Sequence, residues 1–202
     1  MSSILIAYNN DPATVLHDFL ESCADEAKQL CVDNGITYSS VYPPDLNYHN
    51  VVEIMPDYQL CFLAGHGDEN GIYNENGETV ISTFTTNYCF SGKGFYSMAC
   101  LCAQNLHPHL KTLGLRLFVG YNDTFNVRGD RESFIYSAMA GLKSLLSGDN
   151  AEIAKEKMLI TYDEQIAALD ESDPMAAVEL VHNKEALVFE CDNDTTCLVD
   201  LE

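Results

Sequence analysis

Short apolar runs that alternate with segments of helical spacing constrain the fold of this chain more than any other feature. Five such runs occur, at residues 4–10, 36–42, 58–65, 94–100 and 115–121. Elsewhere apolar residues recur at the spacing of helices that pack on one face. Strands separated by helices favour a parallel sheet, because parallel strands need long crossover connections. The sequence therefore predicts an α/β protein, a three-layer α/β/α sandwich around a mostly parallel central sheet.

Helix signals lie between and after these runs. Asp11 and Pro12 have the form of a helix start, in which a capping side chain precedes a proline at the first helical position. Apolar residues then follow at helical spacing as far as Cys31. Further helices are predicted later in the chain, at residues 103–114, 131–146 and 151–169, with a short one opened by Asp173 and Pro174.

Two other segments carry strand and turn signals. Residues 71–94 contain the turn-like stretches "NENGET" and "SGKG", with an edge strand predicted at 79–84. Near the end of the chain, residues 186–190 and 196–201 lie on either side of the stretch "CDNDTT", which predicts a C-terminal β-hairpin. The sequence shows no internal repeat and no clear linker, so we expect one domain over residues 1–202.

The chain is strongly acidic. It has 31 Asp and Glu residues against 10 Lys and Arg, a formal net charge of −21, and residues 151–202 hold 14 acidic residues and 3 Lys. Such a surface repels phosphate backbones, so we expect no nucleic-acid partner. It suits either plain solubility or attraction of a basic partner. No apolar stretch is long enough for a membrane span, so we expect no membrane association either.

Eight cysteines occur without the paired C-x-x-C spacing of a structural zinc site. Several lie inside apolar patterns, where a free cysteine behaves as a small hydrophobic residue. The first residues enter a strand-like run and lack the features of a secretory signal. We therefore expect a reduced, cytoplasmic protein.

Two of the apolar runs end in residues that can carry out chemistry. The stretch "FLAGHG" ends the third run at His66, and "FYSMAC" ends the fourth at Cys100. The carboxyl ends of parallel strands meet at one edge of a sheet, where ligands and chemistry gather. If the third and fourth strands are neighbours, His66 and Cys100 lie at the same edge.

A cysteine and a histidine at one edge would suit nucleophilic catalysis. Cysteine attacks as a thiolate, and histidine can take the thiol proton and return it to a leaving group. We expect a helix directly after Cys100 to favour a negative sulfur through its positive end. Gly67 would let the backbone approach a substrate carbonyl, adopt positive φ and hold an oxyanion with its N–H. A turn histidine and a core cysteine are the alternative interpretation of His66 and Cys100.

The order of these pieces resembles the caspase-like superfamily of cysteine peptidases, which includes caspases, metacaspases, gingipains, clostripain, separase and the bacterial CHAT proteases. The matching stretches are "CFLAGHG" (61–67) and "FYSMAC" (95–100). Residues 115–127 and the helices after them are similar to the later half of bacterial members. The resemblance covers residues 3–170 and leaves 171–202 as an acidic extension.

This resemblance implies roles for single residues. His66 would be the general base or acid and Cys100 the nucleophile, and the N–H groups of Gly67 and Cys100 would form the oxyanion hole. The reaction implied is hydrolysis of a peptide bond through a thioester. No metal or organic cofactor takes part in this chemistry, although some relatives are activated by calcium.

Acidic residues after two strands bear on the substrate. Asp11 follows the first apolar run and Asp123 the fifth. In the family an acidic residue in the specificity pocket goes with cleavage after Arg or Lys, so we expect a basic P1 residue. Helix capping is the simpler role for Asp11. Asp68 and Glu69 either orient His66 or belong to a solvated loop.

Other cysteines and histidines offer alternatives. Cys102 is either a packing residue or an oxidation partner, and we choose Cys100 as the nucleophile because the apolar run continues up to it. His107 and His109 invite a metal site, but a proline separates them and no third ligand is near. We therefore expect these two histidines in a surface turn or helix.

Two functions remain open on the sequence. A caspase-like endopeptidase would act on a protein or peptide substrate under the control of an activating partner. The same fold without activity would be an interaction module whose acidic surface docks a protein partner. A flavodoxin-like binding domain is disfavoured, because "YNNDPAT" lacks the phosphate-binding loop that such proteins use.

Overall fold

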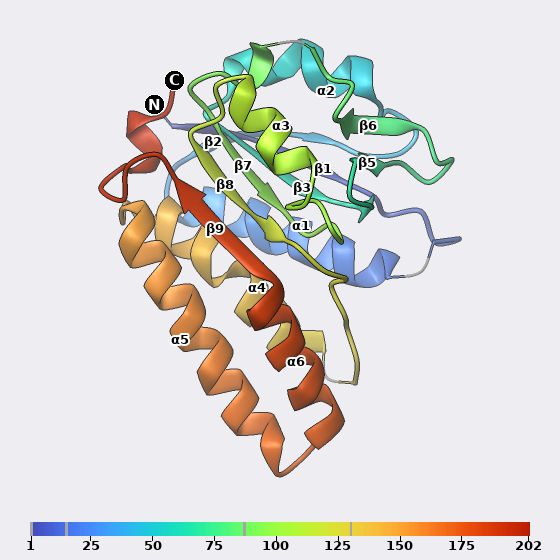
Figure 1. Ribbon diagram of the computed structural model, residues 1–202, viewed down its shortest axis with the longest axis vertical. Helices are drawn as coiled ribbons and strands as arrows, with labels where there is room; N and C mark the ends of the chain where they lie inside the picture. The colour runs from blue at the N-terminus through green and yellow to red at the C-terminus, as the bar shows by residue number, and fades with distance from the viewer. Residues whose placement is uncertain (1, 15, 87, 130) are drawn as a thin grey trace.

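A computed structural model describes residues 2–14, 16–86, 88–129 and 131–202. Its central sheet has six strands in the order β2-β1-β3-β7-β8-β9 (Figure 1). Their bounds are Ser3–Tyr8 (β1), Thr37–Val41 (β2), Leu60–Ala64 (β3), Gly94–Ser97 (β7), Leu117–Tyr121 (β8) and Leu187–Cys191 (β9). The first five are parallel and β9 runs antiparallel to β8, so the predicted mostly parallel sheet is confirmed.

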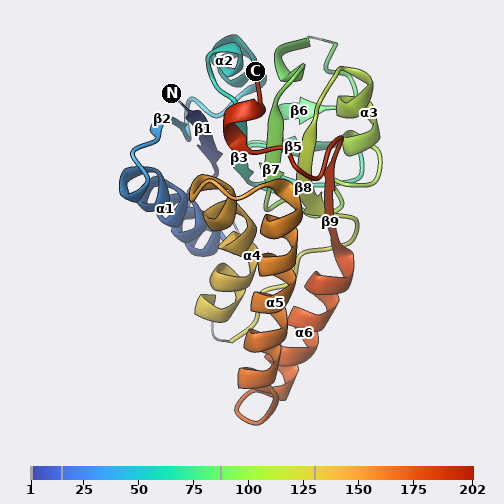
Figure 2. The same ribbon diagram turned by 90° about the vertical axis from the view of Figure 1, so that its left-hand side faces the viewer.

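Helices cover both faces of this sheet, as the prediction of a three-layer sandwich requires. Their bounds are His17–Asp33 (α1), Tyr48–Ile54 (α2), Leu106–Thr112 (α3), Arg131–Leu146 (α4), Ala151–Asp170 (α5) and Pro174–Ala186 (α6). Alternate strand residues point to opposite faces. Ile4 and Ile6 pack in one hydrophobic cluster with α1, α4, α5 and α6, whereas Leu5 and Ala7 pack in a second cluster with α2 and α3. The α5–α6 pair extends beyond the sheet (Figures 1 and 2).

A second, smaller sheet lies between β3 and β7 in the sequence. It is antiparallel and consists of β4 (His66–Gly67), β5 (Gly71–Tyr73) and β6 (Thr79–Ser82). The edge strand predicted at 79–84 is β6, at the edge of this small sheet. This small sheet holds His66 and Gly67 in strand geometry directly after β3.

The helix start predicted at Asp11 is wrong, because α1 begins at His17. The Asp11 carboxylate accepts the N–H of Ala13, and its carbonyl accepts the N–H of Thr14. Asp11 thus closes a local turn that satisfies these donors outside any helix. Leu16, just before α1, has a φ of 67°, so the backbone changes direction there before the helix begins.

The predicted C-terminal hairpin is also wrong. Its first half is β9, which pairs with β8 in the central sheet. Its second half forms a 3₁₀ helix at Leu198–Asp200, capped where the Asp200 carboxylate accepts the N–H of Cys197. The apolar residues Leu198 and Leu201 are buried against the first hydrophobic cluster, so their burial does not require a strand. Among the described helices, none is long and apolar enough to cross a membrane.

Candidate active site

The strand ends that carry His66 and Cys100 meet in the structure. Strands β3 and β7 are parallel neighbours, in register from Leu60 opposite Gly94. A Cβ added to Gly67 would lie 2.8 Å from the Cys100 carbonyl oxygen and 2.9 Å from the Ala99 Cβ. Only a glycine permits this close approach of the two backbones. Gly67 is not one of the glycines with positive φ, so close packing, and not the expected positive φ, accounts for the glycine.

The turn after β7 presents the Cys100 side chain at this edge. Cys100 is half-buried, and Leu101 after it has a φ of 58°, which is uncommon for a residue with a side chain. Sparsely populated backbone conformations of this kind cluster at functional sites. The Leu101 N–H donates to the Asp123 carbonyl at 3.0 Å, so the segment after β8 lies along this turn.

The Cys100 sulfur contacts the backbone of Phe125. The Phe125 N–H donates to Sγ at 3.3 Å, and Sγ lies 4.0 Å from the Phe125 carbonyl oxygen. The Phe125 backbone thus offers the sulfur both a hydrogen-bond donor and an acceptor. The helix expected directly after Cys100 is absent, because α3 begins only at Leu106. Instead, the backbone N–H of Phe125, 25 residues further along the chain, is the donor that contacts the sulfur.

The N–H of Cys100 and the imidazole of His66 are both available for a reactant. Within the described ranges, neither group has a hydrogen-bonding partner. His66 is half-buried and pairs through its backbone with Tyr73 of β5. A free imidazole can take and return a proton, and a free N–H can stabilise an oxyanion.

The loop after His66 is held by Asp68 and Glu69. The Asp68 carboxylate accepts the N–H groups of Asn70 and Gly71 and the hydroxyl of Tyr73, so it holds the loop and does not orient His66. The Glu69 carbonyl accepts the N–H groups of the first residues at α3, Asn105 and Leu106. These bonds tie the histidine loop to the segment that follows Cys100, a link that no sequence pattern indicated.

Two solved structures of gingipain match nearly the whole length of this chain. The structure matches that of the complex of the pro- and mature domains of RgpB from Porphyromonas gingivalis with a TM-score of 0.63, at 12% identity, over 98% of this chain and 49% of that one. It matches the Arg-specific cysteine proteinase gingipain R with a TM-score of 0.60, at 11% identity, over 96% of this chain and 47% of that one. The chain has the caspase-like fold of gingipain.

This chain spans about half the length of the gingipain structures that it matches. At such low identity the likeness concerns the caspase-like fold alone. No protein-family model and no curated protein sequence matches the chain. Gingipain R is a cysteine proteinase.

Burial separates the cysteines of this caspase-like chain into two groups. All eight lie in the described ranges and are free thiols, and five of them are buried: Cys23, Cys31, Cys61, Cys89 and Cys102. Burial raises the pKa of the Cys102 thiol to about 11. Cys191 and Cys197 are half-buried, at the end of β9 and just before the last 3₁₀ helix. Of the half-buried thiols, Cys100 alone lies at the carboxyl ends of the parallel strands.

The two acidic residues considered for substrate binding lie at the same edge. Asp123 is exposed, and its carboxylate accepts the N–H of Thr124. Asp11 follows β1, the other neighbour of β3. Each uses one carboxylate oxygen in a local turn.

The two histidines of α3 lie in different surroundings. Both lie in a helix, as one of the two expected positions had it, but His107 is buried, with its ring 4.2 Å from that of Phe118 between centroids, and so does not lie at the surface. Burial lowers the pKa of His107 below its ordinary value. His109 is half-buried, and its Nε2 lies 2.6 Å from the Thr85 carbonyl oxygen. The described residues contain no group of three or more His, Cys, Asp or Glu that could hold a metal ion.

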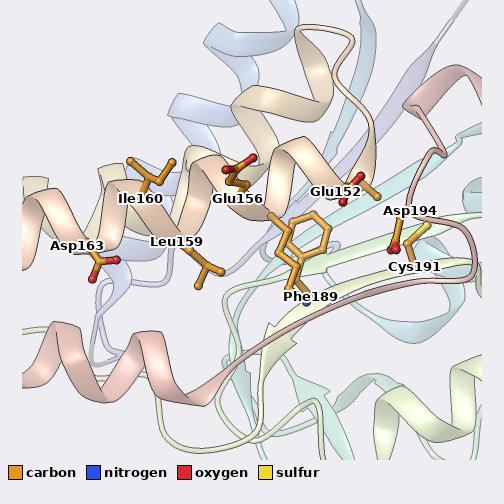
Figure 3. A pocket seen from close by; sticks show the side chains of 10 residues that line it. Glu152, Glu156, Leu159, Ile160, Asp163, Phe189, Cys191 and Asp194 are labelled. Carbon is orange, nitrogen blue, oxygen red and sulfur yellow. The ribbon is translucent and has the colours of Figure 1, made fainter.

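A cavity of about 520 Å³ lies away from these residues, between α5 and β9 (Figure 3). Its apolar side chains include Leu159 and Phe189, and Glu152, Glu156 and Asp194 stand around it. None of its lining residues comes from the strand ends that carry His66 and Cys100. The cavity is therefore separate from the candidate active site.

Proposed function

We propose that this chain is a caspase-like cysteine endopeptidase in which Cys100 is the nucleophile and His66 transfers protons. The observation that carries the proposal is the close approach of Gly67 to the Cys100 backbone, which brings a free imidazole and the accessible thiol to one edge of the sheet. The Phe125 N–H adds support, because it places a backbone hydrogen-bond donor at the Cys100 sulfur.

The reaction follows from the chemistry of these groups. His66 takes the thiol proton, and the Cys100 sulfur attacks the carbonyl carbon of the scissile peptide bond. The N–H groups of Gly67 and Cys100 stabilise the resulting oxyanion. His66 returns the proton to the leaving amine as the C–N bond breaks, which leaves a thioester. Water then attacks the thioester, His66 takes its proton, and the acid product and the thiol are released.

The substrate proposal is cleavage after a basic residue. Asp11 and Asp123 lie after strands at the edge that carries Cys100 and could receive an Arg or Lys side chain. Gingipain R is an Arg-specific proteinase, which supports this proposal. Eight free thiols suit a reducing compartment such as the cytoplasm. We further propose that a partner protein activates the enzyme.

The test is hydrolysis of fluorogenic peptides with Arg, Lys, Asp or Leu at P1, with and without calcium. We expect wild type and Cys102→Ala to cleave peptides with a basic P1 residue. We expect Cys100→Ala to lose roughly 10³-fold or more in rate, as happens when a catalytic nucleophile is removed. Activity that survives in Cys100→Ala would contradict the assignment. A wild type inactive toward all peptides, even with cell extract added as a source of activator, would favour the catalytically silent interaction module.

A further inference from the structure

We infer that His182 on α6 is a positioning residue for Cys100, which acts by orienting the peptide unit between Thr124 and Phe125. This inference rests on the proposed role of Cys100 as the nucleophile. His182 Nε2 lies 2.9 Å from the Thr124 carbonyl oxygen, and the Phe125 N–H donates to Cys100 Sγ. The Thr124 carbonyl and the Phe125 N–H are the two ends of one planar peptide unit. A side chain that holds one end therefore determines where the other end points.

The direction of the hydrogen bond follows from the acceptor. A carbonyl oxygen only accepts, so the hydrogen bond forms with the Nε2–H tautomer of His182, whose Nε2 also lies 3.5 Å from the Thr124 hydroxyl. Hydrogen bonds in a chain polarise one another, and donation to the carbonyl strengthens the N–H of the same peptide unit as a donor. The chain runs from the imidazole through the Thr124–Phe125 peptide to the Cys100 sulfur.

Asn183, next to His182 on α6, holds the backbone on the other side of Phe125 by hydrogen bonds. Asn183 is fully buried, and its amide oxygen accepts the N–H of Asn126 at 2.8 Å. Its Nδ2 donates to the Asn126 carbonyl at 2.7 Å. Glu179, one turn earlier on α6, accepts the side-chain amide of Asn126 at 2.7 Å. Helix α6 thus holds the backbone on both sides of the residue whose N–H contacts Cys100.

Other contacts hold this segment without orienting the peptide unit. The Phe125 ring packs against the rings of Phe19 and Tyr121, with centroids 5.5 and 4.6 Å away. The Gln104 side chain donates to the Asn122 carbonyl. These contacts place the Phe125 side chain and the start of the segment, whereas rotation of the Thr124–Phe125 peptide plane is opposed by His182. The contribution of His182 is therefore separable from the stability of the loop.

The experiment measures the alkylation of Cys100 by iodoacetamide, in which an S–C bond forms and iodide leaves. Mass spectrometry of the Cys100 peptide gives the rate from acidic to alkaline pH. We expect His182→Ala to slow alkylation at neutral pH by about tenfold, the effect of losing one hydrogen bond to a charged group, and to move the rise of the rate to higher pH. His182→Gln keeps an N–H donor near the same place, and we expect a rate within about twofold of wild type.

His109→Ala is the matched control. His109 is also a half-buried histidine whose Nε2 meets a backbone carbonyl, that of Thr85, away from Cys100. We expect this variant to alkylate at the wild-type rate. A wild-type rate in His182→Ala, or an equal slowing in His109→Ala, would overturn the inference.

A second pair of variants, both at buried residues, tests the hydrogen bonds of Asn183 to Asn126. We expect Asn183→Ala to slow alkylation at least as much as His182→Ala. Asn74→Ala is its control, because Asn74 is also buried and holds another loop through bonds to Leu46 and Glu78. Alkylation needs no peptide cleavage. A wild type that cleaves no peptide would therefore count against the proposed endopeptidase, while the His182 series would still decide the positioning role.

Discussion

Two cysteine–histidine pairs of this protein differ in their surroundings although their cysteines are two residues apart. The edge pair, Cys100 and His66, is half-buried at the ends of two parallel strands, and the imidazole has no partner among the described residues. The core pair, Cys102 and His107, is buried; the backbone N–H of His107 donates to the Cys102 carbonyl at 3.1 Å, and its ring packs against Phe118. A reactive cysteine needs solvent access and a histidine without a competing hydrogen bond, so residue type alone does not identify an active site.

The backbone between the two cysteines explains the difference. Leu101 takes up a left-handed conformation, which turns the chain so that the side chains on either side of it diverge. Cys100 packs at the margin of the first hydrophobic cluster, and Cys102 lies inside the second cluster, on the other face of the sheet. One residue with positive φ thus separates a candidate nucleophile from a core residue.

Thiol labelling should give the largest contrast between the pairs. A pKa of about 11 instead of 9.0 means roughly a hundredfold less thiolate at Cys102 than at an ordinary cysteine, and burial slows access further. We therefore expect Cys100 to be alkylated more than about a hundredfold faster than Cys102 in the native protein. Quantitative mass spectrometry of the two labelled positions checks this, with urea-unfolded protein as the control. Equal native rates would break the comparison.

Gly67→Ala should disrupt the edge pair and leave the core pair intact. The new Cβ would meet the Cys100 carbonyl oxygen at 2.8 Å, so the two backbones must separate. We expect kcat/KM for peptide hydrolysis to fall by about a hundredfold, since small displacements of reacting groups are costly. Overpacking should also cost about 1–3 kcal/mol in the free energy of unfolding.

Gly77→Ala serves as the control for this substitution. Gly77 has a φ of +76° and open space around it, so an alanine there strains the backbone but displaces nothing. We expect a loss of about 1–2 kcal/mol in stability and an unchanged kcat/KM. If Gly67→Ala retained full activity, the close approach of the two strand ends would not be needed for catalysis.

The smallest effect concerns the pH dependence of stability from the core pair. Burial lowers the pKa of His107 in the folded protein below 6.5, whereas the unfolded chain keeps the ordinary value. The unfolded state therefore binds more protons as the pH falls below about 6.5, and this contribution to stability is lost in that range.

The substitution His107→Phe keeps a ring against Phe118 and removes this titration. We expect the free energy of unfolding to fall less steeply below about pH 6.5 in the variant, by at most about 1.4 kcal/mol per pH unit, the limit for one proton. Urea unfolding at several pH values measures the slope. Identical slopes in wild type and variant would contradict a buried, neutral His107.

Local patterns predicted most of the elements and some of the site. The helix expected at 131–146 is α4 with the same bounds, and each of the five apolar runs overlaps a strand. The sequence placed His66 and Cys100 at one edge of the sheet on the condition that their two strands are neighbours, because parallel strands end at one edge. The helix start at Asp11 and the C-terminal hairpin were predicted wrongly. A capping Asp has the same local signal in a turn, and an apolar run has the same signal in a 3₁₀ helix.

The sequence by itself determined where strands and helices form, because the spacing of apolar residues is a local property of the chain. Only the tertiary structure decided that β3 and β7 are neighbours across the inserted small sheet. It alone also brought the Phe125 N–H to the Cys100 sulfur and His182 of α6 to the Thr124 carbonyl. Every residue except proline carries the same backbone N–H, so no residue type marks the one that meets the sulfur, and packing between distant segments selects it.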